Sequence, residues 1–127
     1  MIVRGICCLI PGVEGMSENI KVISIVDRYL EHARVYIFAN GGNEIMYTAS
    51  ADWMSRNLDR RIEVIMPIYD THIFREIRTI IDIQLQDNTK SRWINAKQDN
   101  PYKIQKLEEK KIRSQTMTYA FLKSLEK

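Results

Sequence analysis

Apolar and polar positions along the first two thirds of the chain follow patterns that are typical of β-strands. Residues 20–26 alternate and are rich in β-branched side chains, which favours a strand. Residues 34–38 form another apolar run, with apolar residues toward both faces, as in a strand that is covered on both sides. Further strands are predicted at residues 2–9, 45–50 and 61–68, with a short extended piece at residues 91–94.

A turn signal separates two of these predicted strands. The residues Ala-Asn-Gly-Gly-Asn at positions 39–43 contain Asn-Gly and Gly-Gly pairs, which tolerate positive φ. We therefore expect a hairpin here. Residues 51–59 read as irregular and polar, with Trp53 as a packing anchor.

Helical spacing dominates the last third of the chain. Asp70 or Thr71 is expected to cap a helix that runs to about Gln86, with isoleucines and one leucine on a single face. A second helix is predicted over residues 106–126, with several basic residues at its start. Strands followed by helices predict an α/β fold, in which a mixed sheet of five or six strands carries these two helices.

Composition narrows the class of protein. The 127 residues suffice for one domain with a core, and the content of 45% hydrophobic and 28% charged residues is that of a globular chain. The net charge of +3 fits an anionic ligand but is too small to indicate nucleic acid. Adjacent Cys7 and Cys8 indicate reduced thiols in a cytoplasmic protein, and no run is long enough to span a membrane. Because residues 2–9 resemble a core strand with no polar leader, we expect a fragment of a longer protein.

Basic residues near the predicted strands are the candidates for chemistry. If the strand ending at Phe38 begins at residue 32, His32 and Arg34 project to the same side, which suits a phosphate-bearing ligand. Arg4 lies in an apolar run, so it either pairs with a carboxylate such as Asp52 or Glu63, or binds a ligand. Arg61, taken alone, reads as a solvated charge at the end of a strand.

Longer strings carry a family resemblance. The spacing His32-x-Arg34, with SADWMSRN at residues 50–57 downstream, resembles one half of the phospholipase D motif, with Arg in place of Lys. IVRGICCLIPGVEGMSENIK (residues 2–21), SIVDRYLEHARVYIF (24–38), NGG (40–42), RNLDRRIEV (56–64) and LKSLE (122–126) together closely resemble the C-terminal domain of bacterial polyphosphate kinase.

This resemblance implies a fold, a reaction and a set of site residues. The family transfers the terminal phosphate of ATP reversibly to inorganic polyphosphate through a phosphohistidine, with magnesium, and has two C-terminal phospholipase D-like domains, of which this chain resembles the second. By that resemblance Arg4, His32 and Arg61 contact phosphates, and His32 assists catalysis without being the nucleophile. The phosphorylated histidine and the residues near magnesium are expected in the preceding domain, so no metal ligand is expected in this chain.

The remaining expectations concern support and partners. Ser50, Asp52 and Asn57 are expected to orient the basic groups, and Arg34 either faces the pocket or pairs with Asp52. The partners implied are ATP or ADP, polyphosphate, the rest of the parent polypeptide and further copies of it, with no nucleic acid, in a cytoplasmic or membrane-associated enzyme. Two alternatives stay open: half of a phospholipase D-type phosphodiesterase site, and a non-catalytic phosphate-binding module.

Overall fold

The computed structural model describes residues 1–103 and 109–126, which fall into two compact units. The first unit combines Met1–Leu30 with Thr79–Lys127, and the second is Glu31–Arg78. The boundary at residues 78 and 79 lies inside the long helix α2 (Thr71–Gln86). None of the helices in the described residues has the length and hydrophobicity of a membrane span.

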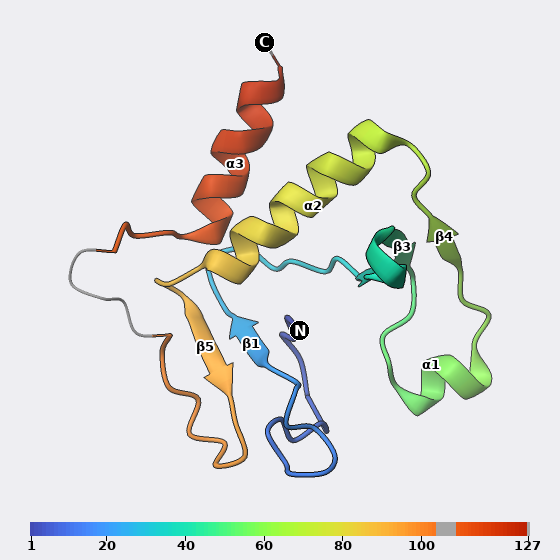
Figure 1. Cartoon of the computed structure of the whole chain (residues 1–127), viewed down its shortest axis with the longest axis vertical. Helices are drawn as coiled ribbons and strands as arrows, with labels where there is room; N and C mark the ends of the chain where they lie inside the picture. The colour runs from blue at the N-terminus through green and yellow to red at the C-terminus, as the bar shows by residue number, and fades with distance from the viewer. Residues whose placement is uncertain (104–108, 127) are drawn as a thin grey trace. The chain divides into compact units, whose positions relative to one another are not determined.

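The first unit is built on a two-stranded antiparallel sheet. Strand β1 (Val22–Ile25) pairs with β5 (Ser91–Ile94), and the two lie side by side in Figure 1. Val22, Ile23 and Ile25 are buried and supply most of the apolar core. These two strands confirm the predictions at residues 20–26 and 91–94.

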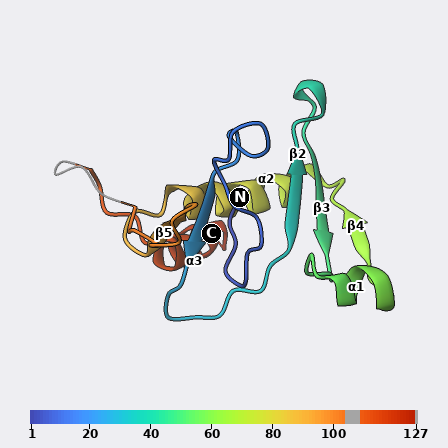
Figure 2. The same cartoon turned by 90° about the horizontal axis from the view of Figure 1, so that it is seen from below.

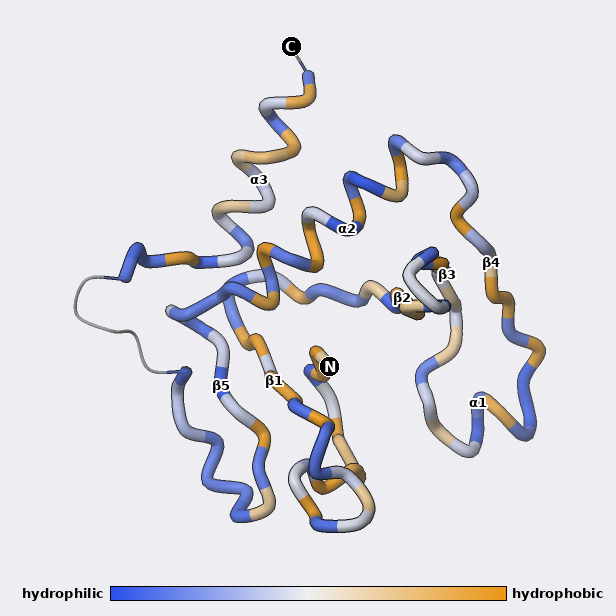
Figure 3. The backbone as a smooth tube through the Cα atoms, viewed as in Figure 1, coloured by the Kyte–Doolittle hydropathy of each residue, from blue (hydrophilic) through white to orange (hydrophobic). Residues whose placement is uncertain are grey.

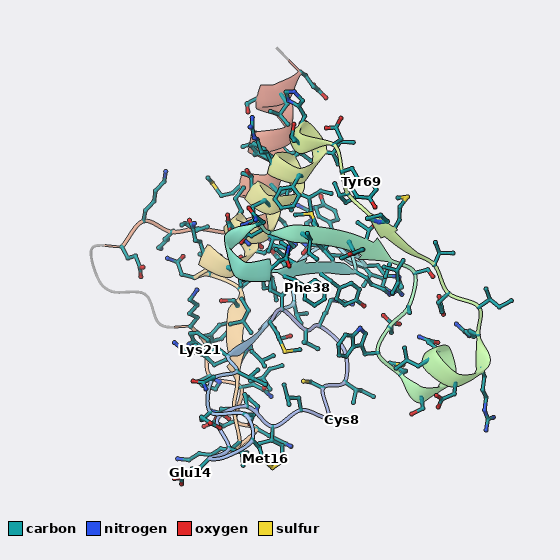
Figure 4. All side chains as sticks on the ribbon, turned by 45° about the vertical axis from the view of Figure 1, so that its right-hand side comes forward. Cys8, Glu14, Met16, Lys21, Phe38 and Tyr69 are labelled. Carbon is teal, nitrogen blue, oxygen red and sulfur yellow. The ribbon has the colours of Figure 1, made fainter. Side chains whose placement is uncertain are left out.

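The predicted strand at residues 2–9 is wrong. Only Ile2 forms a bridge, a parallel one, with Ile23 of β1. Beyond Val3, whose N–H donates to the Ile23 carbonyl at 2.9 Å, the segment leaves β1, and Ile6 is 85% exposed. A strand needs partners for its backbone groups, and without them an apolar run stays irregular. Cys8 lies on this irregular segment, and Glu14 and Met16 lie at the tip of the loop that follows it (Figure 4).

The second unit contains a three-stranded antiparallel sheet. Its order is β2 (Val35–Phe38), β3 (Ile45–Ala49) and β4 (Ile65–Pro67), seen side by side in Figure 2. The predicted hairpin joins β2 to β3 through a 3₁₀ turn, η1 (Asn40–Gly42), in which Asn40, Gly41 and Gly42 have φ of 44°, 64° and 100°. The residues read as turn formers therefore occupy the left-handed backbone conformations they tolerate.

Four further predictions need correction. A single mixed sheet is wrong, because the strands of the described residues form two separate sheets, both antiparallel. Strand β2 is not covered on both sides: its first three residues are half-buried and Phe38 is exposed. Residues 61–64 precede β4 without strand structure, and α1 (Ser55–Arg60) replaces part of the segment predicted to be irregular.

Helix α2 confirms its prediction in both bounds and cap. The Asp70 carboxylate accepts the backbone N–H groups of His72 at 2.8 Å and Ile73 at 3.0 Å, as an N-cap does. In Figure 3 hydrophobic and hydrophilic stretches alternate along α2, as an amphipathic helix requires.

Helix α3 (Ser114–Leu125) starts later than predicted, and the predicted start at Lys106 lies outside the described residues. The Asn88 side chain accepts the Ile112 N–H at 2.7 Å and donates to the Lys110 carbonyl at 3.0 Å. Because these backbone groups bond to a distant side chain, residues 109–113 do not continue the helix toward the N-terminus.

A buried carboxylate organises the start of α3. Asp87 is fully buried, and its Oδ1 accepts the backbone N–H groups of Thr89, Lys90 and Ser91 at 3.0, 2.7 and 3.0 Å. Its Oδ2 accepts the N–H of Ser114 at 2.7 Å. One side chain therefore joins the end of α2, the start of β5 and the first turn of α3.

Candidate functional site

Three polar side chains meet beside the start of β2 in the second unit. A terminal nitrogen of Arg34 (Nη2) lies 2.8 Å from Nε2 of His32, and Arg34 Nε donates to Asp52 Oδ1 at 2.7 Å. The contact confirms that His32 and Arg34 project to the same side. The predicted alternative in which Arg34 pairs with Asp52 is also confirmed.

Charge in this cluster is locally compensated. The Arg34 guanidinium, by donating to Asp52, holds the pKa of that carboxyl below its ordinary value. The carboxylate in turn raises the pKa of Arg34 above its ordinary value. Arg34 and Asp52 therefore stay ionised together, and His32 is the exposed member of the cluster.

The backbone around Asp52 is held by neighbouring side chains. Buried Asn57 donates from Nδ2 to the Asp52 carbonyl at 3.2 Å, and the Tyr36 hydroxyl donates to the Ala51 carbonyl at 3.3 Å. These bonds fix the backbone at residues 51 and 52, and the supporting role expected of Asn57 at a phosphate site stays a prediction. Among the described residues, Asn57 Oδ1 is buried without a hydrogen-bond partner.

Trp53, predicted to be a packing anchor, packs on Tyr36 but stays largely exposed. It is 77% exposed, yet its ring stacks on Tyr36 with 5.8 Å between centroids, and its Nε1 donates to the Tyr36 hydroxyl at 2.8 Å. Tyr36 was not among the predicted site residues. Its place two residues after Arg34 in the strand predicted at residues 34–38 is the signal that could have found it, because such side chains would share a face.

Ser50 follows β3 and links the end of this strand to the segment before β4. Its hydroxyl donates to the Glu63 carboxylate and accepts the Val64 N–H at 3.0 Å. Glu63 and Asp52 were the carboxylates considered as partners of Arg4, and both have other partners. Asp52 and Glu63 belong to the second unit and Arg4 to the first, so the ion pair predicted as one alternative for Arg4 stays a prediction.

Arg4 and Arg61 differ from Arg34 in having no charged partner within their own units. Both side chains are exposed, and neither forms a hydrogen bond or an ion pair with a described residue of its own unit. Arg61 follows α1 in an extended conformation, with φ −122° and ψ 154°. Guanidinium groups in this state can bind phosphate oxygens in a bidentate manner. Arg4 belongs to the first unit, whereas His32 and Arg61 belong to the second. The convergence of these three side chains on one phosphate site therefore stays a prediction.

Metal ligands do not gather in the part of the chain that the structure describes. No group of three or more His, Cys, Asp or Glu side chains is placed there to hold a metal ion. Both cysteines are free thiols. The described residues therefore offer no carboxylate cluster that fits magnesium.

Comparisons with known proteins connect this geometry to a family. The family model described as polyphosphate kinase C-terminal domain 2 matches residues 1–115. Polyphosphate kinase of Escherichia coli (strain K12) is 50% identical over 126 residues, which are 99% of this chain and 18% of that protein. Polyphosphate kinase of Vibrio vulnificus (strain YJ016) is 49% identical over 127 residues, which are 100% of this chain and 18% of that protein.

A solved structure is also similar. The crystal structure of polyphosphate kinase from Porphyromonas gingivalis matches with a TM-score of 0.93 and 48% sequence identity, covering 98% of this chain and 19% of that one. The chain therefore spans about a fifth of the length of the proteins it matches.

Proposed function

We propose a function from one premise: this chain belongs to the polyphosphate kinase C-terminal domain 2 family. It is the second of two phospholipase D-like domains in a longer kinase, which transfers the terminal phosphate of ATP reversibly to inorganic polyphosphate. The reaction passes through a phosphohistidine in the preceding domain. The observation that carries the proposal is the family match over residues 1–115.

Within that enzyme, this chain supplies positive charge to the phosphates. Phosphoryl transfer depends chiefly on positioned charge around the non-bridging oxygens. Arg4 and Arg61 are exposed, and neither bonds to a carboxylate among the described residues of its own unit, which supports their use as phosphate ligands. His32 lies at the exposed end of the Arg34–Asp52 pair and assists charge or proton balance.

The proposed cofactor and partners follow from the same membership. ATP and ADP, polyphosphate and the rest of the parent polypeptide meet this domain, and the parent forms a homo-oligomer in the cytoplasm or at the membrane. The proposal places magnesium on residues of the preceding domain, outside this chain. The isolated chain, without the nucleophilic histidine, is inactive.

Autophosphorylation of the full-length protein tests the role of His32. His32→Ala should lower the yield of phosphoenzyme from ATP by about 10²–10³-fold, the usual cost of removing one positioned donor. The control is His72→Ala, because His72 is an exposed side chain at the first turn of α2. Phosphoenzyme formation near the normal level in a folded His32→Ala protein would refute the proposal.

A further inference from the structure

We infer that Arg34 is a positioning residue that holds His32 as its Nδ1–H tautomer and so makes Nδ1 the ligand-facing atom. A guanidinium group has only donors, so Arg34 Nη2, at 2.8 Å from His32 Nε2, must be the donor of that hydrogen bond. The Nε2 atom then has to be the unprotonated acceptor. The proton of the neutral ring therefore lies on Nδ1.

The direction of this bond is enforced by a second contact of the same guanidinium. Arg34 Nε donates to Asp52 Oδ1 at 2.7 Å, which fixes the plane of the fork. The Asp52 backbone is itself held by Asn57, whose side chain is buried. A flexible lysine in place of Arg34 could not serve both partners with one planar group.

The selected tautomer matters because it opposes the intrinsic preference of the ring. In free neutral histidine the proton favours Nε2, so a majority of Nδ1–H in the folded chain requires a donor at Nε2. Arg34 is that donor. It acts on the ligand only through His32, which distinguishes it from Arg4 and Arg61.

The other ring nitrogen is left available. His32 is exposed, and across the residues that the structure describes its Nδ1 has no hydrogen-bond partner. An Nδ1–H group directed at solvent can donate to one phosphate oxygen while Nε2 stays bonded to Arg34. That the ligand is a phosphate of ATP rests on the proposed function, whereas the tautomer does not.

The tautomer can be measured in the 127-residue chain without nucleotide. The chain has two histidines, so His72→Gln leaves the ring of His32 as the one imidazole signal. Long-range ¹H–¹⁵N correlation of that ring in alkaline buffer, in which imidazole is neutral, distinguishes a protonated from an unprotonated nitrogen. We expect a protonated Nδ1 and an unprotonated Nε2.

Substitution then assigns the cause. Arg34→Met should shift the majority of molecules to the Nε2–H tautomer, and Arg34→Lys should shift it in part. The matched control is Arg60→Gln, which removes a positive charge at an exposed position of the same unit and should leave the tautomer unchanged. A folded Arg34→Met chain that keeps Nδ1–H would overturn the role of Arg34.

The chain that keeps Arg34 can overturn the inference by itself. The test therefore does not depend on whether an Arg34 variant folds. A majority of Nε2–H in that chain would contradict the inferred direction of the hydrogen bond. Titration with ATP then separates the two proposals. If Nδ1–H is the majority but ATP leaves its signal unchanged in the full-length protein, the tautomer assignment stands and the phosphate role of His32 fails.

Discussion

Replacing Asp87 by asparagine should destabilise the first unit, although the two side chains have nearly the same shape. Three backbone N–H groups converge on Asp87 Oδ1 and one, from Ser114, on Oδ2. An amide has one acceptor oxygen. In the more favourable of its two orientations, the amide keeps this oxygen at the Oδ1 position and turns its NH₂ group toward the Ser114 N–H. Two donors then face each other.

The magnitude follows from the burial of those donors. Ser91 and Ser114 are buried, at 1% and 0% exposure, so an N–H group left without an acceptor there costs about 1–3 kcal/mol. Asp87→Asn leaves the Ser114 N–H without an acceptor and should lower the free energy of unfolding by about that amount. Asp87→Ala leaves the buried N–H groups of Ser91 and Ser114 without an acceptor and should lower the free energy of unfolding by about 2–6 kcal/mol. The N–H groups of Thr89 and Lys90 are half-buried and can bond to water. A small domain has only about 5–15 kcal/mol in total, so the larger loss approaches unfolding.

The effect should depend on pH in a defined direction. Burial by itself would raise the pKa of the Asp87 carboxyl, but the N–H groups of Ser114 and Lys90, with the other donors, hold this pKa below its ordinary value. A carboxyl with a lowered pKa in the folded state contributes stability above the unfolded pKa of about 3.9 and loses it as the pH falls through the folded value. The difference between the unsubstituted chain and Asp87→Asn should therefore shrink below about pH 4.

Urea unfolding followed by tryptophan fluorescence provides the assay. The chain has two tryptophans, so Trp53→Phe leaves Trp93 of β5 as a reporter in the same unit as Asp87. With an m-value of about 2 kcal/mol/M, Asp87→Asn should lower the midpoint by about 1 M at pH 7. The control Asp59→Asn makes the same chemical change at an exposed position. If Asp87→Asn falls within about 0.5 kcal/mol of the parent, the range of ordinary surface changes, the proposed role of this carboxylate is wrong.

Two further changes test other parts of the fold. Gly42→Ala should cost about 1–2 kcal/mol in urea unfolding, because Gly42 has φ of 100°. Gly5→Ala should cost little, because an added Cβ meets no atom within 4 Å at either glycine and Gly5 lacks a positive φ; equal effects would contradict the turn geometry. Asp27→Asn should lower the urea midpoint at pH 7, because Asp27, whose side chain is 3% exposed, binds Arg113 through two bonds of 2.8 and 2.6 Å. The Arg113 hydrogen bond lowers the pKa of Asp27, so this loss should fade when unfolding is measured toward pH 3, and a loss that grows in acid would be inconsistent with the pairing.

Some of the candidate site was readable from the chain. The spacing of His32 and Arg34 placed them on one side, and Asp52 was named as a partner for Arg34; the structure confirms both. The contact of Arg34 with Nε2 of His32 was not foreseen, because residue spacing says nothing about which ring nitrogen a donor reaches. Likewise the bond between Ser50 and Glu63 across the end of β3 was not foreseen.

The sequence by itself determined the features that depend on residues close together along the chain. The Asp70 cap, the hairpin at Asn40–Gly42 and the β-branched strand β1 rest on local backbone preferences, and each lies where it was predicted. The tertiary structure alone decided the features that depend on distant partners. Residues 2–9 are as apolar as a strand, but among the described residues they pair with β1 only at Ile2 and Val3. Helix α3 begins at Ser114 because Asp87 and Asn88 bind the backbone at residues 110–114. Backbone hydrogen bonds must be satisfied by whichever groups the fold brings near, and a local pattern does not specify those groups.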